Sequence, residues 1–101
     1  MIDIQPKQLE ELIKILKTHL KTNTSVYAFG SRTNGTARKF SDLDLIIKGQ
    51  QPLNFKDKIA LQEDFSESDL SFRVDISDWF AVSASFKAAI KDKLQLIMIN
   101  K

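Results

Sequence analysis

Two aspartates separated by one residue are the feature of the sequence with the clearest chemical meaning. Asp42 and Asp44 open an apolar run, DLDLII, that has the composition of a buried strand. Because side chains alternate between the two faces of a strand, these two carboxylates point the same way. Neighbouring carboxylates repel each other unless a cation lies between them. Oxygen ligands without histidine or cysteine suit Mg²⁺, which completes its coordination with water and phosphate.

A third carboxylate would let two metal ions share the site and clamp the attacking and leaving oxygens of a phosphoryl group. Asp75 is the first candidate, because residues 72–76 alternate apolar and charged side chains as a strand does. Asp75 would ligate one metal ion and accept the proton of an attacking hydroxyl as a general base. Asp78 is the alternative, although an aspartate there would also suit a turn or a helix cap.

A glycine-serine corner precedes the acidic pair and predicts a phosphate-binding site at Gly30, Ser31 and Arg32. Glycine lets a nucleotide's phosphates approach the backbone closely, where a larger side chain would block them. Ser31 offers a hydroxyl and an amide hydrogen, and a helical turn starting there would direct several amides at an anion. Arg32 can add a charge-assisted hydrogen bond. Arg38 and Lys39 would offset part of a triphosphate's charge.

Each motif taken alone has a simpler explanation. Asp-Leu-Asp at the start of a strand is usually turn capping, and Gly-Ser commonly ends a strand. Asp75 alone would be an exposed strand residue, and the single histidine, His19, is expected to be a partly solvated helix residue. Trp79 and Phe80 are most simply core residues, with an exposed partner-binding patch as the alternative. Only the combination of glycine-serine, paired aspartates and a third aspartate favours phosphoryl chemistry.

The composition sets bounds on the kind of protein. With 101 residues, we expect one domain, spanning residues 1–101, with little room for a second recognition module. The sequence contains no cysteine, which excludes disulfides and thiolate metal sites and favours a reducing, cytoplasmic location. We find neither a long apolar span nor a basic-then-apolar leader, so neither a membrane span nor a signal peptide is expected. A net charge of +2 gives no direct indication of nucleic-acid binding.

Apolar periodicity predicts three helices. Leucine and isoleucine recur at three- and four-residue spacing over residues 5–22, which is one stripe of an amphipathic helix. Residues 54–65 form a second predicted helix, with Asn54 as its cap. Its side chains expected to face the core are Phe55, Ile59 and Phe65. Residues 83–93 form the third.

Short apolar runs predict the strands that carry the candidate site. Strands are expected over residues 25–29, 42–48 and 72–76. Residues 94–99 fit either a closing strand or the tail of the third helix. This order of elements predicts an α/β (α+β) domain with a small mixed sheet of three to four strands, backed by helices on one face.

The segment GSRTNGTARKFSDLD resembles the signature of the nucleotidyltransferase superfamily that includes DNA polymerase beta: glycine-serine, ten residues, then aspartate-x-aspartate. The small size and the later VDISDWF segment are similar to the minimal nucleotidyltransferases, and the resemblance covers nearly the whole chain. It implies a polymerase beta palm-like fold and nucleotide-phosphate contacts at Gly30 and Ser31. It also implies metal ligands at Asp42 and Asp44 and a third carboxylate at Asp75.

The resemblance further implies a partner and an activity. Minimal nucleotidyltransferases are typically paired with a small all-helical protein of the HEPN type, often as the antitoxin of a toxin–antitoxin system. The implied reaction is magnesium-dependent transfer of AMP from ATP to a tyrosine hydroxyl of that partner. A non-catalytic module that neutralises its partner by stoichiometric contact is the alternative. An antibiotic or an RNA end ranks lower as the acceptor, and both homo- and hetero-oligomers stay open.

Overall fold

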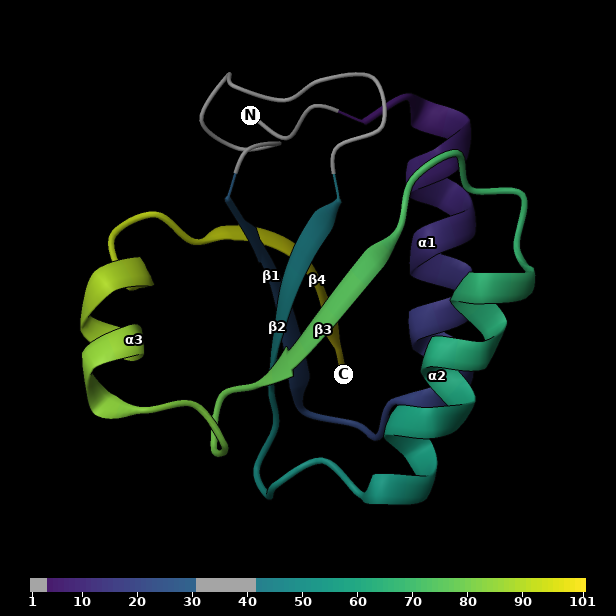
Figure 1. Ribbon diagram of the computed structural model, residues 1–101. Coiled ribbons are helices and arrows are strands. Elements are labelled where there is room, and N and C mark those ends of the chain that lie inside the picture. The colour runs from purple at the N-terminus through teal and green to yellow at the C-terminus, as the bar shows by residue number, and fades with distance from the viewer. Residues whose placement is uncertain (1–3, 31–41) are drawn as a thin grey trace.

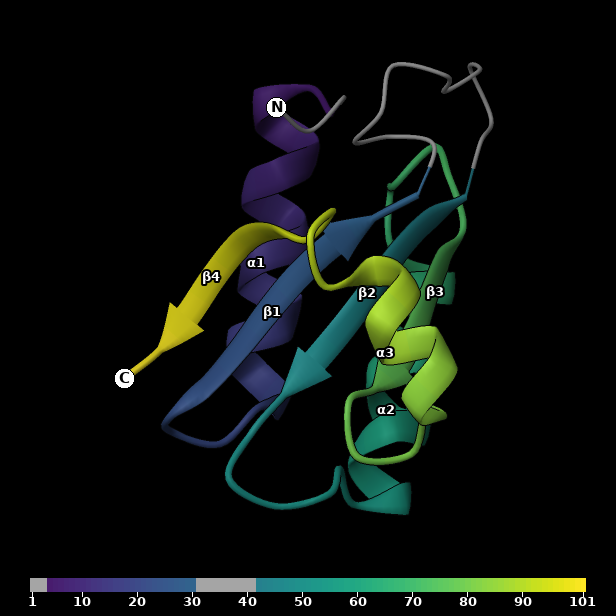
Figure 2. The same ribbon diagram turned by 90° about the vertical axis from the view of Figure 1, so that its left-hand side faces the viewer.

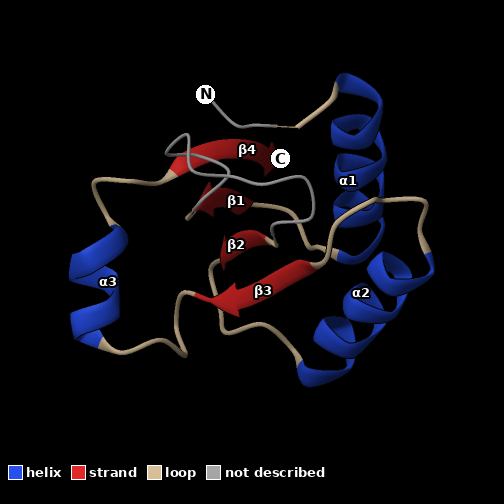
Figure 3. Ribbon diagram, turned by 45° about the horizontal axis from the view of Figure 1, so that its top comes forward, coloured by secondary structure: helices blue, strands red, loops and turns tan. Residues whose placement is uncertain are grey.

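The computed structural model describes residues 4–30 and 42–101. In this part of the chain, four strands form one sheet that lies between two helices on one face and one helix on the other (Figures 1 and 3). The elements are α1 (Pro6–His19), β1 (Thr24–Phe29), β2 (Leu43–Lys48), α2 (Phe55–Glu67), β3 (Val74–Asp78), α3 (Ala84–Ile90) and β4 (Gln95–Asn100).

The strands lie in the order β3-β2-β1-β4. β1 is antiparallel to both β2 and β4, whereas β2 and β3 are parallel, because α2 carries the chain back to the starting edge of the sheet. β1 therefore ends at the edge where β2 and β3 begin, as the strand directions in Figure 2 show. The mixed sheet of the prediction is confirmed, and residues 95–100 form a strand and not a helix tail.

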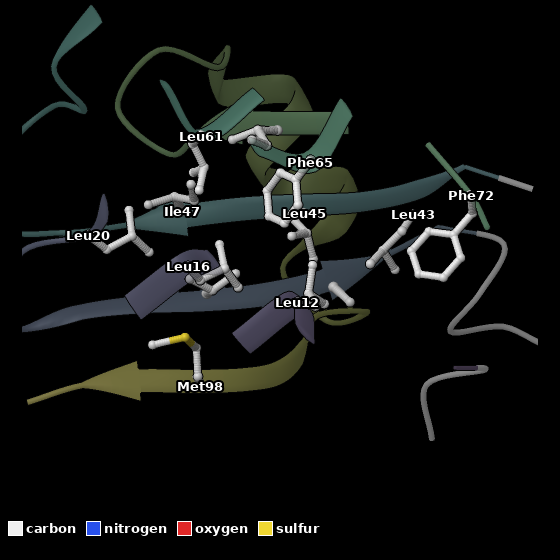
Figure 4. Close-up of a cluster of buried hydrophobic side chains, with 13 residues drawn as sticks. Leu12, Leu16, Leu20, Leu43, Leu45, Ile47, Leu61, Phe65, Phe72 and Met98 are labelled. Carbon is white, nitrogen blue, oxygen red and sulfur yellow. The ribbon is translucent and has the colours of Figure 1, made fainter. Parts of the chain in front are cut away.

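The main core lies between the sheet and the pair α1 and α2 (Figure 4). Alternate residues of β2 are fully or almost fully buried on this face, as the period of two requires. Helix α1 begins with Pro6 in its first turn, where the missing amide hydrogen has no partner to lose. The central contacts come from Leu12, Leu16, Leu43, Leu45, Ile47, Leu61 and Phe65.

Helix α3 covers the opposite face of the sheet, so the expectation that all helices lie on one face was wrong. The Phe86 ring meets the Phe29 ring edge-on, with centroids 5.7 Å apart, and Ile90, the last residue of α3, is buried. The helix is shorter than predicted and begins after Ser83, whose hydroxyl accepts a hydrogen bond from the Phe86 amide. The face that carries the candidate carboxylates thus has a small apolar layer of its own.

Some predicted core residues are exposed. Phe55 is 75% exposed and Ile59 is 40% exposed, whereas Leu61 and Phe65 are the buried residues of α2. Helical geometry gives the reason. Residues two positions apart in the sequence differ in direction by about 200° around the helix axis, so Ile59 points away from the side on which Leu61 is buried. Phe80 was also expected in the core but is 46% exposed, since it lies in the turn that follows β3.

Element ends moved by a few residues. The first helix stops at His19, and the third strand occupies Val74–Asp78, two residues later than predicted. Asn54 caps α2 as expected, its side-chain oxygen accepting from the Lys56 amide at 2.8 Å. None of the helices within the described residues is long and apolar enough to cross a membrane.

Candidate active site

The structure brings the three predicted carboxylates to one edge of the sheet. Asp44 near the start of β2 and Asp75 near the start of β3 are register partners in the parallel pair, so their side chains share a face. Asp42 lies one residue before β2, where its negative charge contributes to the raised pKa of Asp44. Asp42 and Asp75 are exposed, whereas Asp44 is partly buried between the neighbouring strands.

Asp44 is the carboxylate with the most perturbed protonation. Burial raises its pKa above the ordinary value of an aspartate, and the negative charges of Asp75 and Asp42 raise the same pKa further. The ionised form of Asp44 is therefore held at an energetic cost in the metal-free protein. A cation between these carboxylates would remove that cost, which is a physical reason to expect one there.

Gly30 closes the site on the side of β1. Its φ angle is +88°, in the region that favours glycine. A Cβ atom built at this position would collide with Oδ2 of Asp44 and lie 3.4 Å from its Cγ. Glycine is therefore required here for two reasons: the positive φ angle and the close approach of the Asp44 carboxylate. The approach is close because Gly30 directly follows Phe29, the register partner of Asp44.

The rest of the predicted phosphate site is not described. Ser31 and Arg32, like Arg38 and Lys39, lie outside the described residues, so their roles stay predictions. Gly30 and Asp42 mark the two points at which the described strands lead into that segment. Because Phe29 at the end of β1 is the register partner of Asp44, both points lie at the edge of the sheet where Asp44 and Asp75 lie.

The donor chemistry at this edge fits Mg²⁺ bound together with a nucleotide. Within the described residues, no three acidic or histidine side chains converge closely enough to hold a metal ion by themselves. Mg²⁺ does not need such a cage, because it binds through one or two carboxylates and takes its other ligands from water and substrate phosphates. The carboxylates at this edge offer only oxygen ligands, and the repulsion between Asp44 and its two acidic neighbours favours a bound cation.

Asp78, the alternative third carboxylate, lies elsewhere. It pairs with Ile47 at the far end of β3 and faces the main core, only 8% exposed. Its Oδ2 accepts a hydrogen bond from the Leu53 amide at 2.8 Å, and its Oδ1 accepts one from the Phe80 amide at 3.1 Å. Both oxygens of Asp78 accept backbone hydrogen bonds. Of the two candidates, Asp75 is the one that pairs with Asp44.

A hollow beside Asp75 has no counterpart in the sequence predictions. It has a volume of about 520 Å³ and lies between the second half of α2 and the start of β3. No sequence motif marks this hollow, because its lining combines residues near position 62 with residues near position 73. The one related signal in the sequence is the alternation of apolar and charged residues over 72–76. Its walls include Phe65, Leu70, Phe72, Gln62, Arg73 and Asp75.

Comparison with known proteins defines the class. Residues 9–99 match the nucleotidyltransferase domain family. The chain also resembles two solved structures in fold. One is a toxin–antitoxin complex with AMP-PNP (22% identical, TM-score 0.76, covering 92% of this chain and 74% of that chain). The other is an MNT antitoxin bound to a tri-AMPylated HEPN toxin from Shewanella oneidensis (18% identical, TM-score 0.72, covering 96% and 74%).

A curated relative narrows the class. The chain is 43% identical over 100 residues to the probable protein adenylyltransferase MntA of Haemophilus influenzae, covering 99% of this chain and 86% of the relative. This protein therefore belongs to the nucleotidyltransferase family, and within it to the minimal nucleotidyltransferases.

Proposed function

We propose that this protein is a magnesium-dependent protein adenylyltransferase that transfers AMP from ATP to a hydroxyl group of a HEPN-type partner and so acts as an antitoxin. The observation that carries the proposal is the group formed by Asp42, Asp44 and Asp75, in which Asp44 lies against the positive-φ Gly30. The 43% identical relative is named a probable protein adenylyltransferase, which supports AMP as the transferred group.

In the proposed reaction, the acceptor hydroxyl oxygen attacks the α-phosphorus of ATP and forms a new O–P bond. The bond between that phosphorus and the oxygen bridging to the β-phosphate breaks, and pyrophosphate leaves. Asp75 accepts the hydroxyl proton, because it is exposed and lies beside Asp44 on the same face. Asp42 and Asp44 would hold Mg²⁺, which would neutralise part of the charge of the nucleotide's phosphates.

The Gly30 corner would position the phosphates by letting them approach the backbone, with Ser31 and Arg32 as further contacts. A tyrosine is the proposed acceptor, as the resemblance to the minimal nucleotidyltransferases implies. The solved complexes of similar fold support a protein acceptor, because one of them contains a tri-AMPylated HEPN toxin.

The direct test is mass spectrometry of the HEPN-type protein encoded beside this chain, after incubation with this protein, ATP and Mg²⁺. We expect a mass gain of one or more AMP units in that partner, located on tyrosine by fragmentation. The Asp42→Asn variant, matched for size, should give no gain. A tight complex without any gain in mass would contradict the enzyme and favour neutralisation by stoichiometric contact.

A further inference from the structure

The indole ring of Trp79 holds two lysine ammonium groups on the face of the sheet that α3 covers (Figure 2). Nζ of Lys48 lies 5.1 Å from the ring centroid, and Nζ of Lys87 in α3 lies 5.2 Å from it. Both distances are in the range of a cation–π interaction. Trp79 is partly exposed, and Phe80, the next residue, is 46% exposed, so another molecule can reach this group. We call Lys48, Trp79 and Lys87 the basic platform.

The basic platform lies on the same face as the candidate active site. Lys48 follows Asp44 by four residues in β2, and the alternation of side chains puts both on one face. The Trp79 amide donates a hydrogen bond to a carbonyl of β2 at 2.9 Å, which extends the pairing of β3 with β2 by one residue. Trp79 is thus aligned with β3, four residues after Asp75. Its contact with Lys87 places its ring on the α3 side of the sheet.

The strip between the basic platform and the acidic edge is open to a partner protein. Four residues of a strand span about 13 Å. Ser77, which lies between Asp75 and Trp79, is partly exposed, and β3 is a terminal strand of the sheet, so α3 does not close this strip. The triphosphate of a nucleotide held at Asp44 is shorter than the strip. A protein that spans it can contact the basic platform while its hydroxyl reaches Asp75.

The two ammonium groups have no negative partner in the described part of the chain. Neither Lys48 nor Lys87 forms an ion pair with a described carboxylate. Asp3 is the one acidic residue of the sequence that lies outside the described residues. Like charges held against one side chain repel each other, and a carboxylate that approaches both would relieve that repulsion. The basic platform therefore favours an anionic group from another molecule.

We propose that the basic platform is a docking site for an acidic segment of the partner protein, and that this contact orients the partner so that its hydroxyl lies at Asp75. The inference rests on the proposed function for the identity of the partner, and it adds the surface and the charge that select it. Carboxylates of the partner meet Lys48 and Lys87, and an apolar side chain packs against the exposed part of Trp79. The opposite charges at the two ends of this face favour one orientation of the partner.

The charges of this face favour an acidic protein segment over nucleic acid. Single-stranded nucleic acid requires a track of several cations along its phosphates, in addition to stacking surfaces. The strip offers cations only at the basic platform and carries Asp44 and Asp75 at its other end. These carboxylates would repel a phosphate backbone that follows the strip, whereas a protein can present an acidic group at one end and a neutral hydroxyl at the other.

Charge reversal tests the contact. Lys48→Glu and Lys87→Glu each place a negative charge where the partner's carboxylates are expected. Lys14→Glu is the matched control, because Lys14 is an exposed lysine of α1, on the other face of the sheet. For each platform variant we expect the Kd for the partner, measured without ATP, to rise about tenfold or more, while the control stays within about twofold of the unmodified protein. Binding of AMP-PNP with Mg²⁺ should stay unchanged in all three variants.

A conservative variant and the salt dependence separate docking from a structural role. Lys48→Arg keeps the positive charge and the cation–π contact, so it should keep the Kd of the unmodified protein. The Kd of the unmodified complex should rise with NaCl concentration, and this rise should be shallower for Lys48→Glu. If Lys48→Glu lowered Tm but left the Kd and its salt dependence unchanged, the lysine would have a structural role only and the proposal would be wrong.

Zero-length crosslinking gives an independent readout. A carbodiimide joins the amine of a lysine to a carboxylate that lies in contact with it. Mass spectrometry of the crosslinked complex should find Lys48 or Lys87 linked to an aspartate or glutamate of the partner. Crosslinks confined to other lysines, or equal Kd values for the platform variants and Lys14→Glu, would overturn the docking site while leaving AMP transfer intact.

The same measurements distinguish failure of the docking site from failure of the proposed function. If the charge reversals weaken the complex but the unmodified protein transfers no AMP, the proposed function is wrong and the docking site stands. Absence of any complex with the partner would overturn both. Binding of a single-stranded RNA that Lys48→Glu weakens, with unchanged binding of the partner protein, would overturn the assignment of the occupant.

Discussion

Asp75 and Asp78 lie three residues apart on the same strand but have opposite surroundings. Asp75 is exposed beside Asp44 on the face that carries the acidic group, whereas Asp78 is buried on the core face at the far end of β3. The Asp78 carboxylate accepts hydrogen bonds from the Leu53 and Phe80 amides. At Asp44, burial and the negative charges of Asp75 and Asp42 raise the pKa of the carboxyl group.

This difference separates a structural aspartate from a functional one. A carboxylate whose oxygens accept backbone hydrogen bonds stabilises a turn, and the fold explains its presence completely. A group of carboxylates that repel one another gains nothing from the fold and needs a cation or a substrate to justify it. The two ends of the sheet should therefore respond differently to substitution, in transfer activity at one end and in stability at the other.

The largest expected effect is that of Asp44→Asn on AMP transfer. Removing a ligand that holds the metal–nucleotide complex should lower the rate by about 10³-fold or more, since several kcal/mol of charge stabilisation is lost. The variant should unfold at a temperature no lower than that of the unmodified protein. The rate is measured by mass gain of the partner, and transfer at the normal rate would contradict the assignment.

Asp75→Asn comes next. Loss of a general base should lower kcat by about 10²-fold, whereas binding of AMP-PNP with Mg²⁺ falls much less. The two quantities are measured by single-turnover transfer and by nucleotide titration. If Asp78→Asn reproduced the loss of kcat and Asp75→Asn did not, the roles assigned to the two ends of β3 would be reversed.

Gly30→Ala tests the close approach at the corner. The new Cβ would collide with Oδ2 of Asp44 in a backbone conformation with φ +88°, so we expect about tenfold slower transfer and a cost of about 1–2 kcal/mol. Gly49→Ala is the matched control at the other end of the sheet. There a Cβ meets Thr24 Oγ1 at 3.3 Å without a positive φ. Equal effects of the two changes on transfer would contradict a special role for Gly30.

Asp78→Ala should affect stability far more than chemistry. It leaves the Leu53 and Phe80 amides without their acceptor, which costs about 1–3 kcal/mol of unfolding free energy. In a domain of this size, this corresponds to a fall in Tm of at least about 4 °C. Transfer measured well below Tm should stay within about twofold of normal. Thermal unfolding followed by circular dichroism checks the first expectation, and the partner's mass gain checks the second.

The smallest effect concerns the pH dependence of stability without metal. Because the folded pKa of Asp44 is raised, the unfolded chain loses this proton at lower pH than the folded protein does. Stability should therefore fall as the pH rises from the ordinary aspartate pKa through the raised one. Asp44→Asn should remove that part of the fall, as thermal unfolding in EDTA across this pH range would show. An unchanged pH dependence in Asp44→Asn would contradict the repulsion at Asp44.

The sequence was sufficient to predict the acidic edge because its signal is local. The spacing of Asp42 and Asp44 and the run that follows them predict a buried strand with both carboxylates on one face, and the structure has β2 there. The neighbour of that strand was less certain. Only the parallel pairing of β2 with β3 distinguishes Asp75 from Asp78, and pairing between strands separated by a helix leaves no trace in a single sequence.

The predictions that were wrong or missing also concern contacts between distant parts of the chain. Phe55 and Ile59 are apolar, but the register of α2 against the sheet turns them to the solvent, and that register depends on Leu61 and Phe65. The hollow beside Asp75 combines two segments that only the folded chain brings together. Local patterns thus predicted elements and motifs, whereas faces, neighbours and hollows required the tertiary structure.

Cation binding at the two ends of the sheet tests the central claim most directly. Mn²⁺ can replace Mg²⁺ as a spectroscopic probe, and its binding in the presence of AMP-PNP can be followed by electron paramagnetic resonance. We expect the unmodified protein and Asp78→Ala to bind Mn²⁺ with the nucleotide, and Asp44→Asn to lose most of that binding. Undiminished Mn²⁺ binding by Asp44→Asn would contradict the account, because the acidic edge would then not be the metal–nucleotide site.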